Sequence, residues 1–127
     1  MLVAEYMGLP FIYVRPKAKE HGRKNQVEGI LPPNSHVVVI EDLISTGNSS
    51  LNAVKALQEE GAYVQGMIAI FTYGFPQAEQ NFSEAGITLH TLSDYENLIA
   101  VASDKGHISE NQLSALTDWR LQPETWK

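Results

Sequence analysis

The chain contains no cysteine among its 127 residues, which excludes disulfide bonds, thiolate catalysis and cysteine-ligated zinc. It has no apolar run approaching the roughly 20 residues that a membrane span needs, and no charged N-terminal segment followed by an apolar one. We therefore expect a cytoplasmic protein without a membrane partner. Any metal must be bound through oxygen or imidazole ligands.

Positive charge is scarce as well. The chain has 9 Lys and Arg against 15 Asp and Glu, a formal net charge of -6. Because affinity for nucleic acid comes mainly from clustered basic side chains, this balance argues against a nucleic-acid partner. Five of the nine basic residues nevertheless fall within ten positions: Arg15, Lys17, Lys19, Arg23 and Lys24. A small anionic ligand and a solvated basic loop each explain such a cluster.

The sequence does contain enough apolar residues for one core. With 43% hydrophobic and 19% charged residues, we expect residues 1–127 to form a single domain. Strands are expected at 11–14, 37–40, 64–71 and 87–92. Helices are expected at 1–8, 49–61, 76–85, 93–102 and 109–116. This alternation predicts an α/β fold with a mainly parallel sheet flanked by helices.

Two apolar runs and the polar segment between them carry further expectations. The runs at 11–14 and 37–40 lack the alternation of a half-exposed strand, so we expect both to be buried and the second to be covered on both faces. Residues 15–34 are polar and interrupted by glycine and proline, which predicts a long loop with a short β-arm around 26–30. Loops of this length in compact domains are usually functional or disordered.

The C-terminal third shows helix-start signals. Ser93 and Ser109 each stand three residues before Glu or Gln, the spacing of a capping box, so we expect each serine to begin a helix. Trp119 and Trp126 are expected in a short polar tail, where tryptophans more often pack than bind substrate.

The candidate site lies where the run at 37–40 gives way to polar residues. Glu41 and Asp42 follow that run, and a Ser/Thr/Gly sequence occupies 45–49. In open α/β sheets, ligands bind beyond the carboxyl ends of strands, where the next helix offers free backbone N–H groups. The hydroxyls of 45–49 can add donors, and Gly47 lets the backbone approach closely. Two carboxylates can accept hydrogen bonds from sugar hydroxyls, so a phosphorylated sugar suits both halves.

A plainer explanation fits the same residues. The acids can cap a turn, and the serines can simply begin a helix. The chain has neither G-x-x-x-x-G-K-[ST] nor G-x-G-x-x-G, so the usual nucleoside-triphosphate and dinucleotide motifs do not compete with a sugar-phosphate site.

The run Val37 to Ser49, VVVIEDLISTGNS, resembles the signature with which type I phosphoribosyltransferases bind 5-phosphoribosyl 1-diphosphate (PRPP). Its parts are four apolar residues, two acids, two apolar residues and a Thr/Gly phosphate loop. The resemblance implies an N-terminally truncated type I phosphoribosyltransferase fold in which Glu41 and Asp42 are catalytic. The PRPP-binding residues that it implies are Glu41, Asp42, Leu43, Ile44, Ser45, Thr46, Gly47, Asn48 and Ser49.

The sequence VRPKAKEHG at 14–22 resembles the mobile catalytic loop of orotate phosphoribosyltransferases, and NQVEG at 25–29 extends the match. The resemblance implies that 15–34 form this loop and that Lys19 is a catalytic residue which stabilises the departing pyrophosphate. Fixed cations act in this way where negative charge develops in the transition state. The PRPP-binding residues implied here are Arg15, Lys17, Lys19 and His21.

By this resemblance the reaction is transfer of 5-phosphoribose from PRPP to orotate, giving orotidine 5′-monophosphate and pyrophosphate in de novo pyrimidine biosynthesis. The resemblance also implies a homodimer with shared active sites. Mg²⁺ is the implied cofactor, carried by PRPP, with no protein ligand assigned. The matching part is the later portion of the family's sequence, so we expect the N-terminal region, which forms much of the orotate site, to be missing.

Ser45 and Tyr73 are the candidate orotate contacts. Tyr73 stands in a segment where some family members place an arginine that touches the orotate ring, so the acceptor is less firmly indicated than PRPP. A packing role at the end of a strand is the alternative for Tyr73.

Two other functions share the signature. A purine or other base phosphoribosyltransferase would keep the residues at 37–49, but the loop at 15–29 disfavours it. A non-catalytic PRPP-binding regulatory module would keep the phosphate loop without needing Lys19. Pyrophosphate release that depends on orotate distinguishes these functions.

Overall fold

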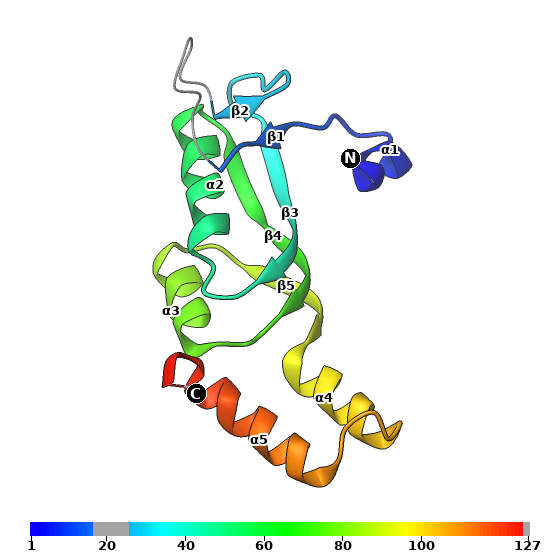
Figure 1. Ribbon diagram of the computed structural model, residues 1–127. Helices are drawn as coiled ribbons and strands as arrows, with labels where there is room; N and C mark the ends of the chain where they lie inside the picture. The colour runs from blue at the N-terminus through cyan, green and yellow to red at the C-terminus, as the bar shows by residue number, and fades with distance from the viewer. Residues whose placement is uncertain (17–25, 126–127) are drawn as a thin grey trace.

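A three-stranded parallel sheet in the order β3-β4-β5 forms the centre of the computed structural model, which describes residues 1–16 and 26–125 (Figure 1). The strands are β3 (His36–Ile44), β4 (Tyr63–Thr72) and β5 (Leu89–Asp94). The predicted α/β fold with a parallel sheet and flanking helices is confirmed. β3 is longer than predicted, because it continues through the two acids to Ile44.

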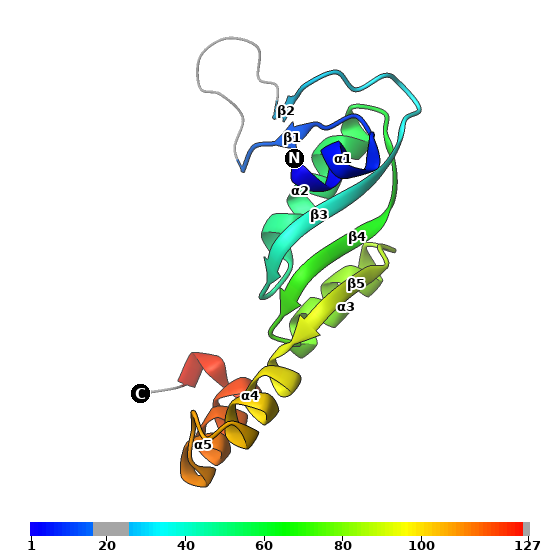
Figure 2. The ribbon, with the colours of Figure 1, turned by 90° about the vertical axis from the view of Figure 1, so that its right-hand side faces the viewer.

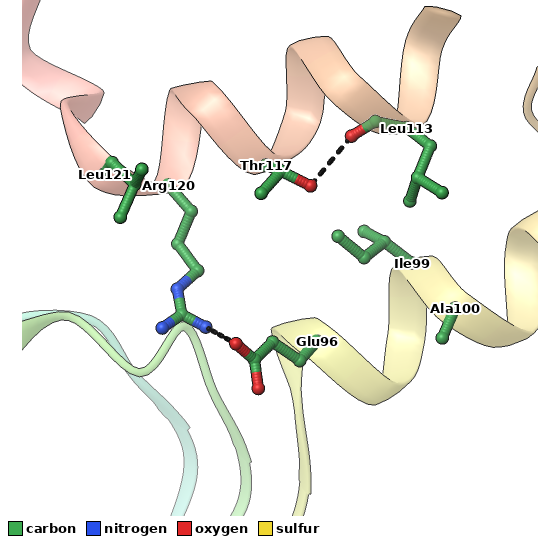
Figure 3. A pocket seen from close by; sticks show the side chains of 7 residues that line it. All are labelled: Glu96, Ile99, Ala100, Leu113, Thr117, Arg120 and Leu121. Atoms are coloured by element: carbon green, nitrogen blue, oxygen red, sulfur yellow. Dashed lines mark hydrogen bonds and ion pairs between the residues drawn. The ribbon is translucent and has the colours of Figure 1, made fainter. Parts of the chain in front are cut away.

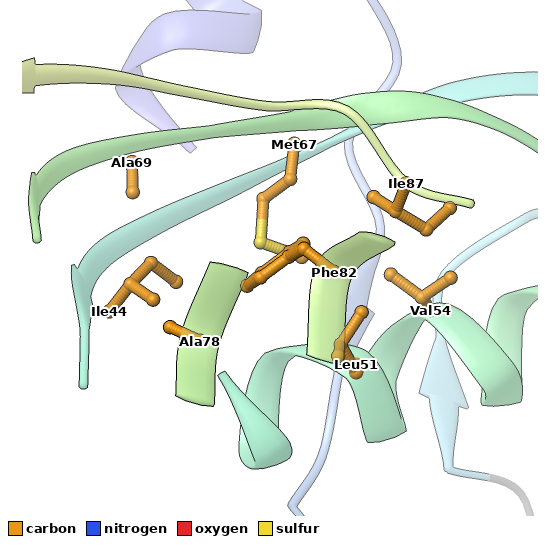
Figure 4. Close-up of a cluster of buried hydrophobic side chains, with 8 residues drawn as sticks. All are labelled: Ile44, Leu51, Val54, Met67, Ala69, Ala78, Phe82 and Ile87. Carbon is orange, nitrogen blue, oxygen red and sulfur yellow. The ribbon is translucent and has the colours of Figure 1, made fainter. Parts of the chain in front are cut away.

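Helices α2 (Asn48–Glu59) and α3 (Pro76–Glu84) cover one face of this sheet (Figures 1 and 2). The sequence predicted that one side of α2 would be apolar, and that side meets the strands. Between helices and sheet lies the core (Figure 4), which comprises Ile44, Leu51, Val54, Met67, Ala69, Ala78, Phe82 and Ile87. The site is therefore attached to a packed layer on this side of the sheet.

The other face of the sheet is open among the described residues. Side chains from all three strands lie on it with exposed fractions between 39% and 77%: Val38, Ile40, Ile68, Ile70 and Leu92. The expectation that the strand at 37–40 is covered on both faces is therefore wrong for the described chain. Burial alternates along β3, with Val39 packed against the core and its two neighbours exposed. The apolar run predicted two buried faces, but the described chain supplies cover for only one.

A small antiparallel pair stands apart from the main sheet. It consists of β1 (Tyr13–Val14) and β2 (Val27–Glu28). The short β-arm expected around 26–30 is therefore confirmed. The buried strand expected at 11–14 is wrong, because only its last two residues form a strand and Phe11 is 49% exposed. Before it, α1 (Leu2–Met7) ends in a left-handed glycine, as predicted for residues 1–8.

A helical hairpin lies beyond the carboxyl ends of the strands (Figure 1). It consists of α4 (Tyr95–Asp104) and α5 (Glu110–Leu121), followed by the 3-10 turn η1 (Pro123–Thr125). Among the residues that the structure describes, no helix has the length and apolar character to cross a bilayer.

The two helix starts of the hairpin differ from each other. The capping box at Ser109 is confirmed. The backbone N–H of Gln112 donates to the Ser109 side chain, and the backbone N–H of Ser109 donates to the Gln112 side chain. The box expected at Ser93 is wrong, because Ser93 still belongs to β5 and Asp94 is the N-cap. The carboxylate of Asp94 accepts a hydrogen bond from the backbone N of Asn97 at 2.9 Å, and the hydrogen bonds from Asn97 lower the pKa of Asp94.

Four aromatic side chains, here called the aromatic junction, join the hairpin to the end of β4: Tyr73, Phe75, Tyr95 and Trp119. The Tyr73 ring stacks on Phe75 at 5.4 Å between centroids, and Trp119 lies 5.7 Å from Tyr73 and 5.3 Å from Tyr95. Trp119 is thus part of α5 and not of a polar tail, while its expected packing role is confirmed. Trp126 lies outside the described residues.

Met67 and Ile70 lie on opposite faces of β4. Substituting each of them tests which face of the sheet forms the core. Met67 is 0% exposed, whereas Ile70 is 58% exposed on the open face. We expect Met67→Ala to lower the free energy of unfolding by about 2–5 kcal/mol, because it leaves a cavity in the core. Ile70→Ala should cost about 0.5 kcal/mol or less. Urea unfolding followed by circular dichroism measures both losses, and equal losses would contradict the core described here.

Candidate functional site

The two acids of the signature lie within β3. Glu41 pairs in register with Ala69 and shares the face of Val39, because side chains alternate along a strand. The alternation of burial ends at Asp42, because Leu43 is exposed as well and Ile44 is buried in the core. Glu41 is half-buried and Asp42 is exposed. The predicted role of both carboxylates, which is to accept hydrogen bonds from sugar hydroxyls, stays a prediction.

Ile44, the last residue of β3, joins this strand to the end of β4. Its side chain is 0% exposed in the core. Its carbonyl oxygen accepts hydrogen bonds from the backbone N of Tyr73 at 3.0 Å and from Oγ1 of Thr72 at 3.4 Å. Ile44 therefore fixes the start of the loop to the core and to β4. Because its side chain is buried, a ligand cannot contact it. The neighbouring Leu43 is 45% exposed.

Residues 45–49 form the turn that leads into α2. Gly47 is the N-cap of α2 with φ 78°, a left-handed conformation that favours glycine. A Cβ at Gly47 would lie 2.6 Å from Cε2 of Phe82, so the position needs glycine for space as well. The helix has neither a side-chain cap nor an acidic residue in its first turn. Free N–H groups at the start of such a helix are suited to bind an anion.

Asn81 of α3 holds this turn from the side, and the sequence analysis missed it. Its Nδ2 donates to the carbonyl oxygen of Thr46 at 2.9 Å and to Oδ1 of Asn48 at 3.1 Å. Asn81 lies more than thirty positions from the loop, so no local pattern signals the contact. Only the packing of α3 beside α2 brings them together.

Of the PRPP ligands predicted in the loop at 15–34, the structure describes only Arg15. Arg15 is described, and its Nε donates to Oε1 of Glu28 at 2.7 Å, with both side chains about 40% exposed. Its backbone N also donates to the carbonyl oxygen of Gln26, which extends the β1–β2 pair. The sequence analysis did not foresee the partner Glu28. The remaining predicted PRPP ligands of the loop lie outside the described residues: Lys17, Lys19 and His21.

Tyr73 lies at the carboxyl end of β4, next to Ile44. Its ring contacts Phe71 edge-on at 5.6 Å and belongs to the aromatic junction, which fits the packing role weighed for it. In the same junction, burial raises the pKa of Tyr95, whose hydroxyl donates to the carbonyl oxygen of Leu116 at 3.3 Å. Ser45, the other candidate orotate contact, is exposed at the start of the loop at 45–49. Both orotate contacts stay predictions.

Neither of the two hollows described here is lined by residues 41–49. One, of about 310 Å³, separates α4 from α5 (Figure 3) and is lined by Glu96, Ile99, Ala100, Leu113, Thr117, Arg120 and Leu121. The other, of about 320 Å³, lies between the base of the arm and α2. Within residues 1–16 and 26–125, no three His, Asp or Glu side chains gather as ligands for a metal.

Comparison with known proteins gives close relatives. No family model matches the sequence. The orotate phosphoribosyltransferases of Cytophaga hutchinsonii and Porphyromonas gingivalis are each 55% identical to the chain, over 126 and 125 residues. These matches cover 99% and 98% of the chain and 60% of each relative. The chain thus spans about 60% of the length of these curated relatives.

Solved structures share the fold. The orotate phosphoribosyltransferase from Aeropyrum pernix has a TM-score of 0.70 and 28% identity, over 85% of this chain and 58% of that one. The UMP synthase of Leishmania donovani has a TM-score of 0.77 over 94% of this chain and 26% of that one; at 21% identity it shows the fold alone. Over the part of these relatives that it spans, the chain is similar to orotate phosphoribosyltransferases in sequence and in fold.

Proposed function

We propose that the chain is the PRPP-binding portion of an orotate phosphoribosyltransferase. In the proposed reaction, the bond from the anomeric carbon of PRPP to pyrophosphate breaks and a bond to orotate forms, giving orotidine 5′-monophosphate in pyrimidine biosynthesis. The observation that carries the proposal is the loop at 45–49. It leads into a helix without a side-chain cap, in a chain 55% identical to orotate phosphoribosyltransferases.

The loop at 45–49 is the proposed place of the 5′-phosphate. Backbone N–H groups at a helix N-terminus and the hydroxyls of Ser45, Thr46 and Ser49 are the donors that a phosphate needs. Gly47 and Asn81 support this function by fixing the shape of the loop. A preformed loop loses little conformational freedom on binding, which favours affinity.

The carboxylates at the end of β3 are proposed to serve the ribose and the charge that develops on it. Asp42 is exposed and suited to accept hydrogen bonds from sugar hydroxyls, while Glu41 is half-buried on the other face. Lys19 is proposed to stabilise the departing pyrophosphate, because a fixed cation lowers the barrier most where negative charge appears. Arg15, Lys17 and His21 are proposed PRPP ligands from the same segment.

Mg²⁺ is the proposed cofactor, and the residues present fit a metal carried mainly by the substrate. Glu41 and Asp42 offer two carboxylates, one half-buried and one exposed, and Mg²⁺ is usually held by phosphates, waters and one or two carboxylates. When bound, the ion would neutralise charge on the pyrophosphate. A homodimer with shared active sites and a cytoplasmic location are further proposals, drawn from the resemblance and the composition.

The purified chain tests the proposal directly. We expect PRPP to bind in the presence of Mg²⁺, measured by calorimetry, and pyrophosphate to be released only when orotate is added. Binding without release would favour a regulatory module, and release with a purine base in place of orotate would favour the purine enzymes. Absence of PRPP binding would contradict the proposed function itself.

Gly47 and Gly61 form a matched pair for testing the phosphate loop. Both have positive φ, 78° and 83°, but a Cβ at Gly61 meets nothing within 4 Å, whereas one at Gly47 meets Phe82. Each change to Ala should cost about 1–2 kcal/mol of stability through backbone strain. Only Gly47→Ala should displace the loop, and we expect it to weaken PRPP binding by about tenfold, or ~1.4 kcal/mol. Calorimetry that finds equal PRPP affinity in the two variants would remove Gly47 from the site.

Asn81→Ala tests the support given by α3. Loss of hydrogen bonds to the loop, at about 0.5–1.5 kcal/mol each, should weaken PRPP binding by roughly two- to tenfold. The control is Gln80→Ala, because the Gln80 side chain bonds only Glu84 within α3 and should leave PRPP affinity unchanged. The same dissociation constant in both variants would show that the loop keeps its shape without Asn81.

A further inference from the structure

The open face of the sheet is a continuous apolar surface. Ile40 pairs in register with Ile68, and Ile68 pairs with His90, so these residues lie in one row across the three strands. Ile70 and Leu92 lie two positions further along their strands and on the same face. The four apolar side chains are between 39% and 77% exposed. Monomeric proteins rarely leave such a contiguous apolar surface without a binding role.

Helix α1 also has an apolar side without a partner. Leu2 and Tyr6 are about one turn apart, as are Val3 and Met7, so the four side chains form one stripe along the helix. They are between 50% and 94% exposed, and no residue of α1 is buried. Isolated helices shorter than about 12–15 residues are marginal in water. A helix of six residues therefore needs a surface to pack on.

The helix and the open face lie on the same side of the molecule. Figures 1 and 2 show α1 on the side of the sheet opposite to α2 and α3. Residues 8–12 join α1 to β1, and within them Leu9 and Phe11 are 55% and 49% exposed. The chain thus presents an apolar helix and an apolar sheet face toward the same side, and neither is buried by the other.

A second copy of the chain supplies a complement to both surfaces. A contact with two-fold symmetry has to be self-complementary, and a helix with an apolar stripe packs well on the apolar face of a sheet. A stable interface takes about 800 Å² and 20–30 residues from each partner, with an apolar core. The five residues of the open face form only part of such a core. With the six exposed apolar residues of 2–11, the set reaches eleven: Leu2, Val3, Tyr6, Met7, Leu9, Phe11, Val38, Ile40, Ile68, Ile70 and Leu92.

We propose that a second copy of this chain covers the open face, with α1 of each copy packed on the sheet of the other. Reciprocal exchange uses both surfaces of both copies, so assembly stops at a dimer and does not continue to a fibre. The contact involves neither residues 41–49 nor the loop at 15–34, and is separate from the shared active sites proposed above. It does not rest on the proposed function.

Sedimentation equilibrium of the purified chain tests the assembly, and we expect a dimer. Leu92→Lys on the open face and Tyr6→Lys on α1 should each weaken dimerisation about tenfold or more, because each brings a charge into a contact without water. The control is Leu98→Lys, because Leu98 of α4 is 52% exposed and belongs to neither surface. A monomeric unaltered chain, or a dimer that either Leu92→Lys or Tyr6→Lys leaves intact, overturns the proposal.

Cross-linking shows which sheet α1 contacts, and its variants keep the charge of the chain. The sequence contains no cysteine, so a Tyr6→Cys chain can be mixed with chains that carry cysteine at Ile40, Ile68 or Leu92, one position on each strand. After re-equilibration and oxidation, we expect at least one mixture to give disulfide-linked pairs with one chain of each kind. Tyr6→Cys mixed with Leu98→Cys is the control and should not link. A double variant such as Tyr6→Cys/Ile68→Cys that closes its disulfide within one monomeric chain would show that α1 packs on its own sheet, which contradicts the exchange.

Discussion

The carbonyl oxygen of Ile44 connects the parts of the site. It accepts hydrogen bonds from the backbone of Tyr73 and the hydroxyl of Thr72, while the Ile44 side chain is buried in the core. The end of β3 and the end of β4 are thereby fixed to each other and to the helix-covered layer. The loop at 45–49 continues from the first end, and the Tyr73–Gly74 turn continues from the second. A displacement at Ile44 would change both together, because a close-packed core transmits strain.

Local features of this arrangement could be predicted from the sequence because their causes are local. The apolar face of α2, the glycine at the end of α1 and the capping box at Ser109 all depend on residues within a few positions of one another. The strand, acidic pair and Ser/Thr/Gly loop likewise follow in unbroken order. The helix start at Asp94 was misplaced by one residue, because Ser93 and Asp94 are both good N-caps and the extent of β5 decides between them.

The rest depends on contacts between distant segments, which no window of sequence contains. Asn81 reaches the loop because α3 packs beside α2, and Arg120 reaches Gly74 because the aromatic junction holds α5 against β4. The open face of the sheet was missed for a related reason. A continuous β-branched run indicates that two faces are apolar, but it does not say which segment covers the second. The burial of Glu41 and Asp42 also differs, although they are adjacent in sequence, because Glu41 is half-buried and Asp42 is exposed.

The two ends of the site are built by different means, and the difference bears on their functions. The phosphate loop is fixed by the buried core, by Phe82 against Gly47 and by Asn81, so it is part of the most tightly packed layer. The end of β4 is completed by a hairpin whose contacts with the sheet are mainly aromatic rings and one partly exposed ion pair. Exposed ion pairs contribute about 0–1 kcal/mol, so the hairpin's position rests on the rings. A loop built into the core keeps its shape when surface elements change. The α4–α5 hairpin is therefore an element that can vary without disturbing that core.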